Sequence, residues 1–572
     1  MTVRTVSQHD RAPKLARPEG VERMDSTMQQ TELLVADLLE HGARVHAEAR
    51  VVHYDGGPST DTTFADVADE AARLAGGLRE LGVGRDDVVA TLSWNTPAHL
   101  VAYFAVPAMG AVLHTLNLRL SDDQLIYIVN HAEDRVVLVG ADLTPQLARI
   151  LPRCPSVTDV IVVGPAEAEL SGVRVLDYDT LVARAEPVRR WPQLPERSAA
   201  VLCYTTGTTG DPKGVAYSHR SIYLHTLAIS TGSAFGFSDA DRVLPIVPMF
   251  HANAWGWPYA AWVAGAALIM TDRYLQAEHL AQIITEHRPT AAAAVPTLWT
   301  ALDAHGVKHD TDFSSLRLGV VGGSPLSAAL VESFAAHHGL RLTQGWGMTE
   351  TSPLLTFSRP PAGTAQGEGA DVAYRARTGR LVPGVRARAV DEQGSELPWD
   401  GESAGEIELR GATIAGSYFR ASPAAIAEKF RDGWLRTGDL GVIHPSGWVE
   451  LKDRLKDGIK SGGEWISSVE LENQLAAHPA VAEVVVIGVP DPQWEERPLV
   501  CVRLRQGADA SPAQLREFLH GKVARWWLPE RWAFVDEIPK TSVGKLDKKT
   551  VRATHGAGRF DIVEINTIAK DA

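Results

Sequence analysis

Cysteine is scarce in this sequence, and long apolar runs are missing. The 572 residues include three cysteines, which are widely spaced and odd in number: Cys154, Cys203 and Cys501. Neither a disulfide framework nor a thiolate zinc cluster is therefore indicated, and a cytoplasmic location fits best. No run of about 18 apolar residues occurs and the N-terminus lacks the apolar core of a signal peptide, so we expect no integral membrane association.

Basic residues are fewer than acidic residues in this chain. The chain carries 56 Lys and Arg against 70 Asp and Glu, which gives a formal net charge of −14. A polyanion is a poor partner for such a chain, so we expect no nucleic-acid binding. Hydrophobic residues make up 45% and charged residues 22%, as in globular proteins, and the length predicts two or more domains.

The pattern of the chain predicts an α/β fold. A helical period over 64–81 leads into an apolar run over 86–92, and short β-branched runs recur at 135–139, 159–163 and 318–322, as in buried parallel strands. Beyond about residue 375, alternating strands predict a small β-barrel-like subdomain, and a compact α+β pattern follows residue 454. The predicted parts are a flexible N-terminal extension (1–28), a large layered α/β domain with that subdomain (29–452), a hinge (453–457), a smaller α+β C-terminal domain (458–555) and a tail (556–572).

A loop rich in glycine and threonine follows the apolar run at 199–202. Its glycines let backbone N–H groups converge on an anion, its hydroxyls add donors and its lysine adds charge, so we predict phosphate binding. The loop is not a Walker motif, because Gly214 follows the lysine where Ser or Thr is required. A plain Thr/Gly turn is the structural alternative. The predicted phosphate-binding residues are Thr205, Thr206, Gly207, Thr208, Thr209 and Lys213.

This loop resembles the signature of the adenylate-forming superfamily, which includes acyl-CoA synthetases, beetle luciferases and the adenylation domains of peptide synthetases. The resemblance runs from about residue 30 to about residue 550, with the motifs in the family's order. In the segments 251–255 and 460–467 the chain closely resembles the medium- and long-chain fatty acyl-CoA synthetases. The resemblance implies ATP, Mg²⁺ and coenzyme A as cofactor and co-substrates, and a C-terminal domain that is mobile about the hinge.

The segment 344–353 is similar to the family's second nucleotide motif. By that similarity, Thr349 contacts the α-phosphate and Glu350 holds Mg²⁺, a role that suits a hard carboxylate oxygen. A Gly-rich turn with a packed aromatic is the alternative reading. The residues expected around adenine are Gly323, Ser324, Gly345, Trp346 and Gly347, with Trp346 where the family usually has tyrosine.

The segments around 436–440 and 453–464 resemble the ribose site and the hinge of the family. Asp439 is expected to accept the ribose hydroxyls, Arg454 to contact the nucleotide and Lys456 to be the pivot. The resemblance places Lys460, Gly462 and Gly463 along the channel for coenzyme A. An Asx turn and a solvated linker are the alternatives.

Two further motifs supply chemistry. The segment 539–547 resembles the catalytic-lysine loop, so Lys545 is expected to stabilise the charge that develops as a carboxylate attacks the α-phosphate. The segment 248–259 resembles the acid-binding motif, with His251 beside the substrate carboxylate and Trp255 and Trp257 at the acyl pocket, although core packing is common for tryptophan. Ala252 stands where amino-acid-activating relatives carry an aspartate, which disfavours amino-acid substrates.

These features predict an acid–thiol ligase that forms an acyl-adenylate from ATP and a small hydrophobic carboxylic acid, and then a thioester with coenzyme A. Medium- or long-chain fatty acids are favoured, while aryl and terpenoid acids stay open. The main alternative is a dedicated adenylating enzyme of a specialised-metabolite pathway that hands its acyl group to another acceptor. A luciferase-like oxygenase and an inactive nucleotide-binding regulator are further alternatives. The resemblance leaves a homodimer open.

Overall fold

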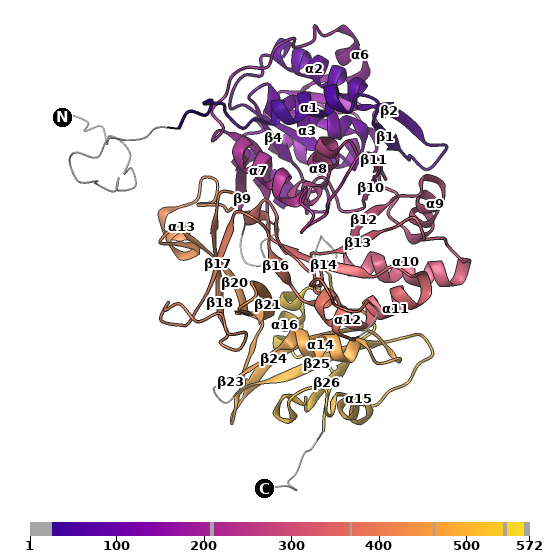
Figure 1. Ribbon diagram of the computed structural model, residues 1–572, viewed down its shortest axis with the longest axis vertical. Coiled ribbons are helices and arrows are strands. Elements are labelled where there is room, and N and C mark those ends of the chain that lie inside the picture. Colours follow the sequence, from indigo (N-terminus) through magenta and orange to yellow (C-terminus); the bar gives the residue numbers. More distant parts are fainter. Residues whose placement is uncertain (1–25, 206–210, 367–368, 462–463, 541–545, 566–572) are drawn as a thin grey trace, which may run out of the picture. The chain divides into compact units, whose positions relative to one another are not determined.

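The computed structural model describes residues 26–205, 211–366, 369–461, 464–540 and 546–565. The chain divides into two compact units, Met1–Glu32 and Leu33–Ala572, and the fold described below belongs to the second unit. Three sheets organise this unit (Figure 1). The predicted α/β class is confirmed.

The first sheet has seven strands, and all neighbours in it run parallel except its last pair. Its strands are, in spatial order, β7 (Arg174–Asp177), β6 (Asp159–Val163), β5 (Val136–Gly140), β3 (Val88–Leu92), β4 (Val112–Thr115), β8 (Ala199–Tyr204) and β9 (Gly214–Ser218). Successive residues face opposite sides, so Val89 packs in one apolar cluster and Ala90 in another. Burial on both faces explains the continuous apolar runs in the sequence.

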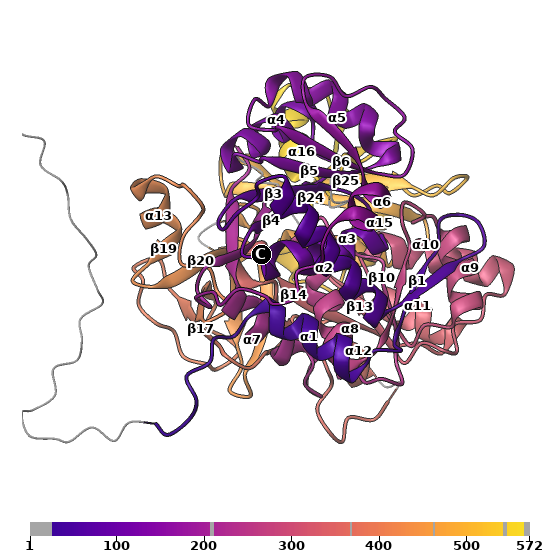
Figure 2. The same cartoon turned by 90° about the horizontal axis from the view of Figure 1, so that it is seen from above.

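Helices cover both faces of this sheet. One face packs against α1 (Val35–Val45), α2 (Phe64–Glu80), α3 (Pro97–Ala108), α7 (His219–Ile229) and α8 (Trp257–Ala264). The other face packs against α4 (Asp122–Ala132) and α5 (Thr144–Ile150), while α6 (Tyr178–Arg184) lies beside α2. Figure 2 shows α1, α2 and α3 gathered on one side of the sheet.

The second sheet changes from parallel to antiparallel pairing at β14. Its parallel part contains β1 (Arg50–His53), β11 (Ala267–Met270), β10 (Arg242–Pro245), β12 (Ala291–Ala294), β13 (Leu318–Val321) and β14 (Leu342–Gly347), with β2 (Thr60–Thr63) antiparallel at the edge. Its antiparallel part contains β15 (Leu354–Phe357), β16 (Gly379–Leu381), β21 (Trp448–Arg454), β20 (Trp434–Ile443), β18 (Gly405–Gly411) and β17 (Val385–Val390), with β19 (Phe430–Arg431) on β20. These antiparallel strands are the β-rich region that the alternating pattern predicted.

Helices of the second sheet lie mainly beside its parallel part. They are α9 (Ala277–His287), α10 (Pro296–His309), α11 (Ala328–His338) and α12 (Gly369–Ala376), with α13 (Pro423–Lys429) beside β19 and β20. In Figure 1, α9, α10 and α11 form a row next to β12, β13 and β14. Leu280, Trp299 and Phe334, one from each helix, are fully buried in a shared apolar cluster.

The C-terminal part contains a six-stranded sheet. Its strands are β23 (Glu464–Ile466), β22 (Ile459–Ser461), β24 (Val481–Asp491), β25 (Glu495–Leu504), β26 (Arg531–Phe534) and β27 (Ile562–Glu564), and its helices are α14 (Ser468–Ala476), α15 (Pro512–Leu519) and α16 (Lys548–Gly556). This α+β composition matches the prediction.

Two helix predictions were inaccurate at their ends. The sequence pattern over 31–41 predicts a helix that starts at residue 31, but α1 begins at Val35, because Asp37 accepts a hydrogen bond from the Leu34 N–H and fixes the N-terminus there. The sequence pattern after residue 454 also predicts a helix over 512–524, but α15 ends at Leu519, because Gly521 turns the chain with a φ of 76°. Among the described residues, no helix is both long and apolar enough to cross a membrane.

Candidate functional site

The candidate site follows from the parallel part of the second sheet. Strands β10, β12, β13 and β14 are parallel neighbours, so the segments after their carboxyl ends meet at one edge. β10 leads into the predicted acid-binding segment, β13 into Gly323 and Ser324, and β14 into Thr349 and Glu350. The side-chain oxygen of Gln344, on β14, accepts a hydrogen bond from the Leu326 N–H at 2.7 Å and so ties the last two segments together.

Glu350 lies in a short 3₁₀ turn, η4 (Thr349–Thr351), between β14 and β15. Its side chain is 6% exposed, and its Oε1 accepts a hydrogen bond from the Tyr418 hydroxyl at 2.5 Å. The carbonyl of Thr349 accepts a hydrogen bond from the Tyr217 hydroxyl, also at 2.5 Å. Two tyrosines therefore fix both predicted α-phosphate and magnesium residues in place, and neither tyrosine was predicted to do so.

The two described ends of the predicted phosphate loop are held together. Thr205 donates its N–H to the Lys213 carbonyl at 2.9 Å, and the Lys213 N–H donates to the Thr205 hydroxyl at 3.4 Å. The Lys213 ammonium lies 5.1 Å from the centroid of the Tyr418 ring, within the range of a cation–π interaction. Tyr418 thus joins the loop lysine to the carboxylate of Glu350. The next residue, Phe419, donates its N–H to the Gly214 carbonyl at 2.8 Å.

Gly345, Trp346 and Gly347 end β14. Gly347 has no room for a side chain, because a Cβ there would lie 2.0 Å from the Pro353 carbonyl oxygen. The Trp346 ring is buried in the apolar cluster of the antiparallel strands, beside residues such as Leu355 and Ile407. In this position the ring packs β14 against the antiparallel strands, and an adenine contact for Trp346 stays a prediction.

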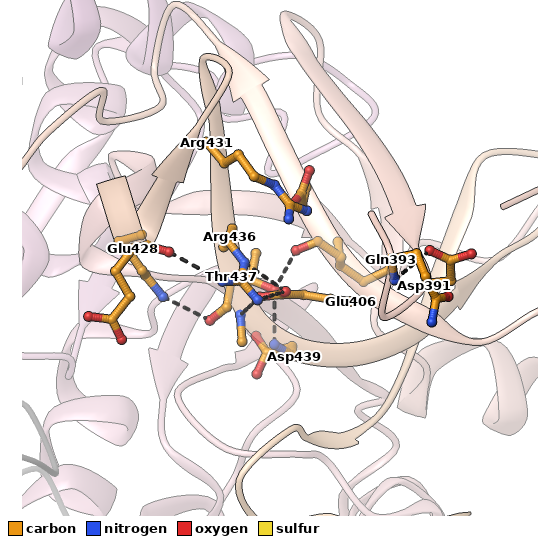
Figure 3. Close-up of polar contacts among 12 residues, drawn as sticks. Asp391, Gln393, Glu406, Glu428, Arg431, Arg436, Thr437 and Asp439 are labelled. Carbon is orange, nitrogen blue, oxygen red and sulfur yellow. Dashed lines mark hydrogen bonds and ion pairs between the residues drawn. The ribbon is translucent and has the colours of Figure 1, made fainter. Parts of the chain in front are cut away.

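Asp439 is buried on β20, opposite Arg454 on β21. Arg454 Nε lies 2.6 Å from Asp439 Oδ1, so the predicted ribose and nucleotide residues form an ion pair. The Asp439 N–H donates to the Thr437 hydroxyl at 3.0 Å, and that hydroxyl donates to the Ile407 carbonyl at 2.7 Å. Figure 3 shows Asp439 and Thr437 beside the neighbouring pair of Arg436 and Glu406.

Lys429 is a residue that the sequence analysis missed. Its ammonium donates to the Thr437 carbonyl at 3.2 Å. Burial lowers the pKa of Lys429, and the nearby carboxylates of Glu350 and Asp439 partly oppose that shift, whereas Arg454 adds to it. A half-buried ammonium therefore lies within electrostatic range of both Glu350 and Asp439, the predicted magnesium and ribose residues. A lone lysine at a helix end carries no sequence signal that would have shown this.

Asn95 holds the predicted acid-binding segment after β10 in place. The Asn95 amide donates to the carbonyls of Pro245 and Val247 at 2.8 and 3.0 Å, and its oxygen accepts from the Met249 N–H at 2.7 Å. Since Asn95 is buried, these bonds are shielded from water. They hold the segment two residues before His251, whose side chain is half buried.

Beyond His251 the backbone is strained. Residues 252–255 all have positive φ, between 44° and 57°, which costs about 1–2 kcal/mol per non-glycine residue. This left-handed turn brings the Trp255 ring onto the end of β13, where a Cβ on Gly322 would lie 2.8 Å from the ring and 3.1 Å from the Gly345 carbonyl. Trp257, by contrast, is fully buried and packs against Phe235 and Phe237, and a place for it in the acyl pocket stays a prediction.

The predicted hinge is a tight turn. The N–H groups of Asp457 and Gly458 donate to the Arg454 carbonyl at 2.9 and 2.7 Å. Arg552, on α16, lies 2.7 Å from the Asp457 carboxylate. Burial lowers the pKa of Lys456. The Lys460 N–H donates to Glu496 at 3.0 Å, which fixes β22 where the predicted channel begins.

Several predicted residues lie outside the described residues, so their roles stay predictions. They are Thr206, Gly207, Thr208, Thr209, Gly462, Gly463 and Lys545. The two described segments next to Lys545 still show a local arrangement, because Lys540 and Leu546 form an isolated β-bridge.

Comparison with known proteins identifies the family. Residues 39–419 match the AMP-binding enzyme family, and residues 470–545 match the AMP-binding enzyme C-terminal domain. This chain belongs to the AMP-binding enzymes. It is 41% identical to a 3-methylmercaptopropionyl-CoA ligase of Ruegeria pomeroyi, with 92% of this chain and 98% of the relative covered. It is 43% identical to a long-chain-fatty-acid–CoA ligase of Thermus thermophilus, over 93% and 98% of the two chains.

A solved structure supports the same assignment. The crystal structure of the anthranilate CoA ligase AuaEII with anthranoyl-AMP has a TM-score of 0.83 and 26% identity to this AMP-binding enzyme, and covers 94% of this chain and 99% of its own. The predicted resemblance to adenylate-forming enzymes is confirmed. So is the predicted class of AMP-forming acid–thiol ligase, because the relatives are named as CoA ligases.

Proposed function

We propose that this protein activates a hydrophobic carboxylic acid with ATP, through an acyl-adenylate, and transfers the acyl group to coenzyme A. Medium- or long-chain fatty acids are the favoured substrates. The observation that carries the proposal is the packing of Trp255 on Gly322, beside the Gly345 carbonyl. It brings the segment that is predicted to bind the acid against the strand ends that are predicted to bind the nucleotide.

The proposed reaction requires the acid and the nucleotide to bind next to each other. A carboxylate is a poor acyl donor, so it must attack the α-phosphate of ATP before a thiol can displace AMP. The first step joins two anions, and fixed positive charge stabilises its transition state. Lys213, whose ammonium lies over the Tyr418 ring, and Lys429, which interacts electrostatically with Glu350, are proposed to supply this charge together with Lys545.

Glu350 fits the predicted magnesium role. Magnesium is usually bound by one or two carboxylates together with substrate phosphates, and a buried carboxylate held by a tyrosine hydroxyl meets that need. When bound, the ion would neutralise phosphate charge. The protein contributes the fixed direction of the Glu350 carboxylate through Tyr418 and of the Thr349 segment through Tyr217.

The predicted acid-binding segment favours an acyl group that carries no positive charge. Ala252 is buried, and Trp255 and Met249 are apolar, so an ammonium on the substrate would lack a partner among these residues. The two relatives named above act on acids of very different length by their names, and both acids lack a cationic group. Chain length is therefore the property that direct assay must settle.

The test is to incubate the full-length protein with ATP, Mg²⁺ and a panel of acids, with and without coenzyme A. The panel contains 3-methylmercaptopropionate, octanoate, palmitate, benzoate and, as a control, phenylalanine. Release of AMP and pyrophosphate together with the acyl-CoA product, for fatty acids above the others, supports the proposal. Adenylate that accumulates despite coenzyme A would instead indicate another acyl acceptor.

The sequence also predicts the domain boundaries given above and a cytoplasmic location, and it leaves a homodimer open.

A further inference from the structure

We propose that Asp303, His337 and His338 form a binding site for a divalent transition-metal ion, separate from the nucleotide site. Asp303 lies on α10, and the two histidines end α11. Asp303 Oδ1 is 2.9 Å from His337 Nδ1 and 3.1 Å from His338 Nε2. One ligand atom from each of the three residues lies within 4.8 Å of the other two, so a single ion can reach all three.

The ligand types select the class of ion. Two imidazole nitrogens and one carboxylate oxygen suit Zn²⁺, Co²⁺ or Ni²⁺, whereas Mg²⁺ and Ca²⁺ prefer oxygen ligands. Three protein ligands leave a fourth position for water, and the His337 side chain is 45% exposed, so an ion can enter from solvent.

The groups behind the ligands hold them in position. The second carboxylate oxygen of Asp303 accepts a hydrogen bond from the Ser333 hydroxyl at 2.5 Å, which fixes the orientation of the carboxylate. The His338 ring is 5% exposed and packs against Phe313 and Phe334. Gly306, one turn after Asp303, makes room for that ring, because a Cβ there would lie 2.7 Å from His338 Cε1.

The consequence of binding would be structural. An ion would tie α10 to the C-terminal end of α11, a few residues before β14 begins at Leu342. β14 carries the nucleotide motif. Because an ion that binds the folded chain stabilises it in proportion to the logarithm of its concentration, the melting temperature should rise with added metal. This inference does not depend on the identity of the acyl substrate.

The first experiment uses Co²⁺ as a spectroscopic probe. Full-length protein without a histidine tag is treated with chelator, dialysed and titrated with Co²⁺. We expect visible d–d absorption that saturates at one ion per chain, displacement of this signal by Zn²⁺, and a melting temperature about 1–4 °C higher with Zn²⁺ than with chelator. Absence of a saturable signal would show a hydrogen-bonded cluster only and would overturn the proposal.

Variants locate the site. His337→Gln and Asp303→Asn should each weaken Co²⁺ binding about tenfold or more, since even the loss of a supporting group costs 10- to 100-fold in affinity. His309→Ala is the matched control, because His309 also lies at a helix end and stacks on His305 at 4.3 Å, outside the cluster. Cobalt binding that His309→Ala weakens and His337→Gln leaves unchanged would also overturn the proposal.

Discussion

The hydrogen bond from Tyr418 to Glu350 offers a precise perturbation. Tyr418→Phe removes one hydroxyl and keeps the ring next to the Lys213 ammonium. Tyr418 is 5% exposed, so water cannot readily replace the lost donor at the buried carboxylate. Loss of a hydrogen bond that orients a metal-binding carboxylate typically lowers metal affinity about 10- to 100-fold, which corresponds to about 1.4–2.8 kcal/mol.

We expect this loss to appear in magnesium dependence. The Mg²⁺ concentration that half-saturates acid-dependent ATP–pyrophosphate exchange should rise about 10-fold or more in Tyr418→Phe, and calorimetry should show weaker Mg·ATP binding. Tyr54→Phe is the control, because the Tyr54 hydroxyl bonds His279 and Gln282 away from the site. If Tyr418→Phe matched Tyr54→Phe in both measurements, the assigned role of this hydrogen bond would be refuted.

Four further predictions concern the predicted ribose residue Asp439, the neighbouring Lys429, the predicted acyl-pocket residue Trp255 and the buried His225. Asp439→Asn removes the charge that pairs with Arg454, so the KM for ATP should rise about tenfold. Initial rates at varied ATP concentration would measure this change, and an unchanged KM would contradict the predicted ribose role. Burial lowers the pKa of Lys429, so this lysine loses its proton at a lower pH than an ordinary lysine and activity should decline at alkaline pH. Lys429→Arg should move that decline to higher pH. Identical pH–activity profiles for the two proteins would contradict a role for the Lys429 charge. Trp255→Ala opens space beside Gly322, so kcat/KM should shift towards bulkier acids across the substrate panel, whereas a uniform loss for all acids would contradict a role in selectivity. Burial lowers the pKa of His225 from 6.5 to about 3, so this residue binds more protons in the unfolded state as pH falls below 6.5. Its contribution to the free energy of unfolding should therefore drop by about 2 kcal/mol from pH 7 to pH 5. Urea unfolding should show a smaller drop for His225→Asn, and equal drops would be inconsistent with this reasoning.

The placement of the parallel strands could be predicted because local chemistry repeats there. Runs such as 136–140 and 159–163 are β-branched and apolar, and each is buried on both faces. Helix ends were harder to predict, because a single contact decides them. The Asp37 bond to the Leu34 N–H and the turn at Gly521 each moved an end by several residues.

The candidate site shows the same division. Glu350, Asp439 and Arg454 stand in motifs whose spacing is visible in the sequence, and the structure pairs the last two across adjacent strands. Tyr418 and Lys429 have no motif that was recognised from the sequence. Tyr418 contacts Glu350 because the chain between β18 and β20 returns to η4, about 70 residues after Glu350. Lys429 lies in the same stretch and bonds the Thr437 carbonyl on β20.

The sequence by itself determined the family and the reaction class and predicted the residues that carry the chemistry, because these depend on short segments with fixed spacing. Tertiary structure alone decided which side chains orient those residues. Hydrogen bonds such as that of Tyr418 to Glu350, and close approaches such as that of Trp255 to Gly322, join segments about 70 residues apart. Such contacts depend on how strands and loops are placed in space, and no local pattern of residues encodes them.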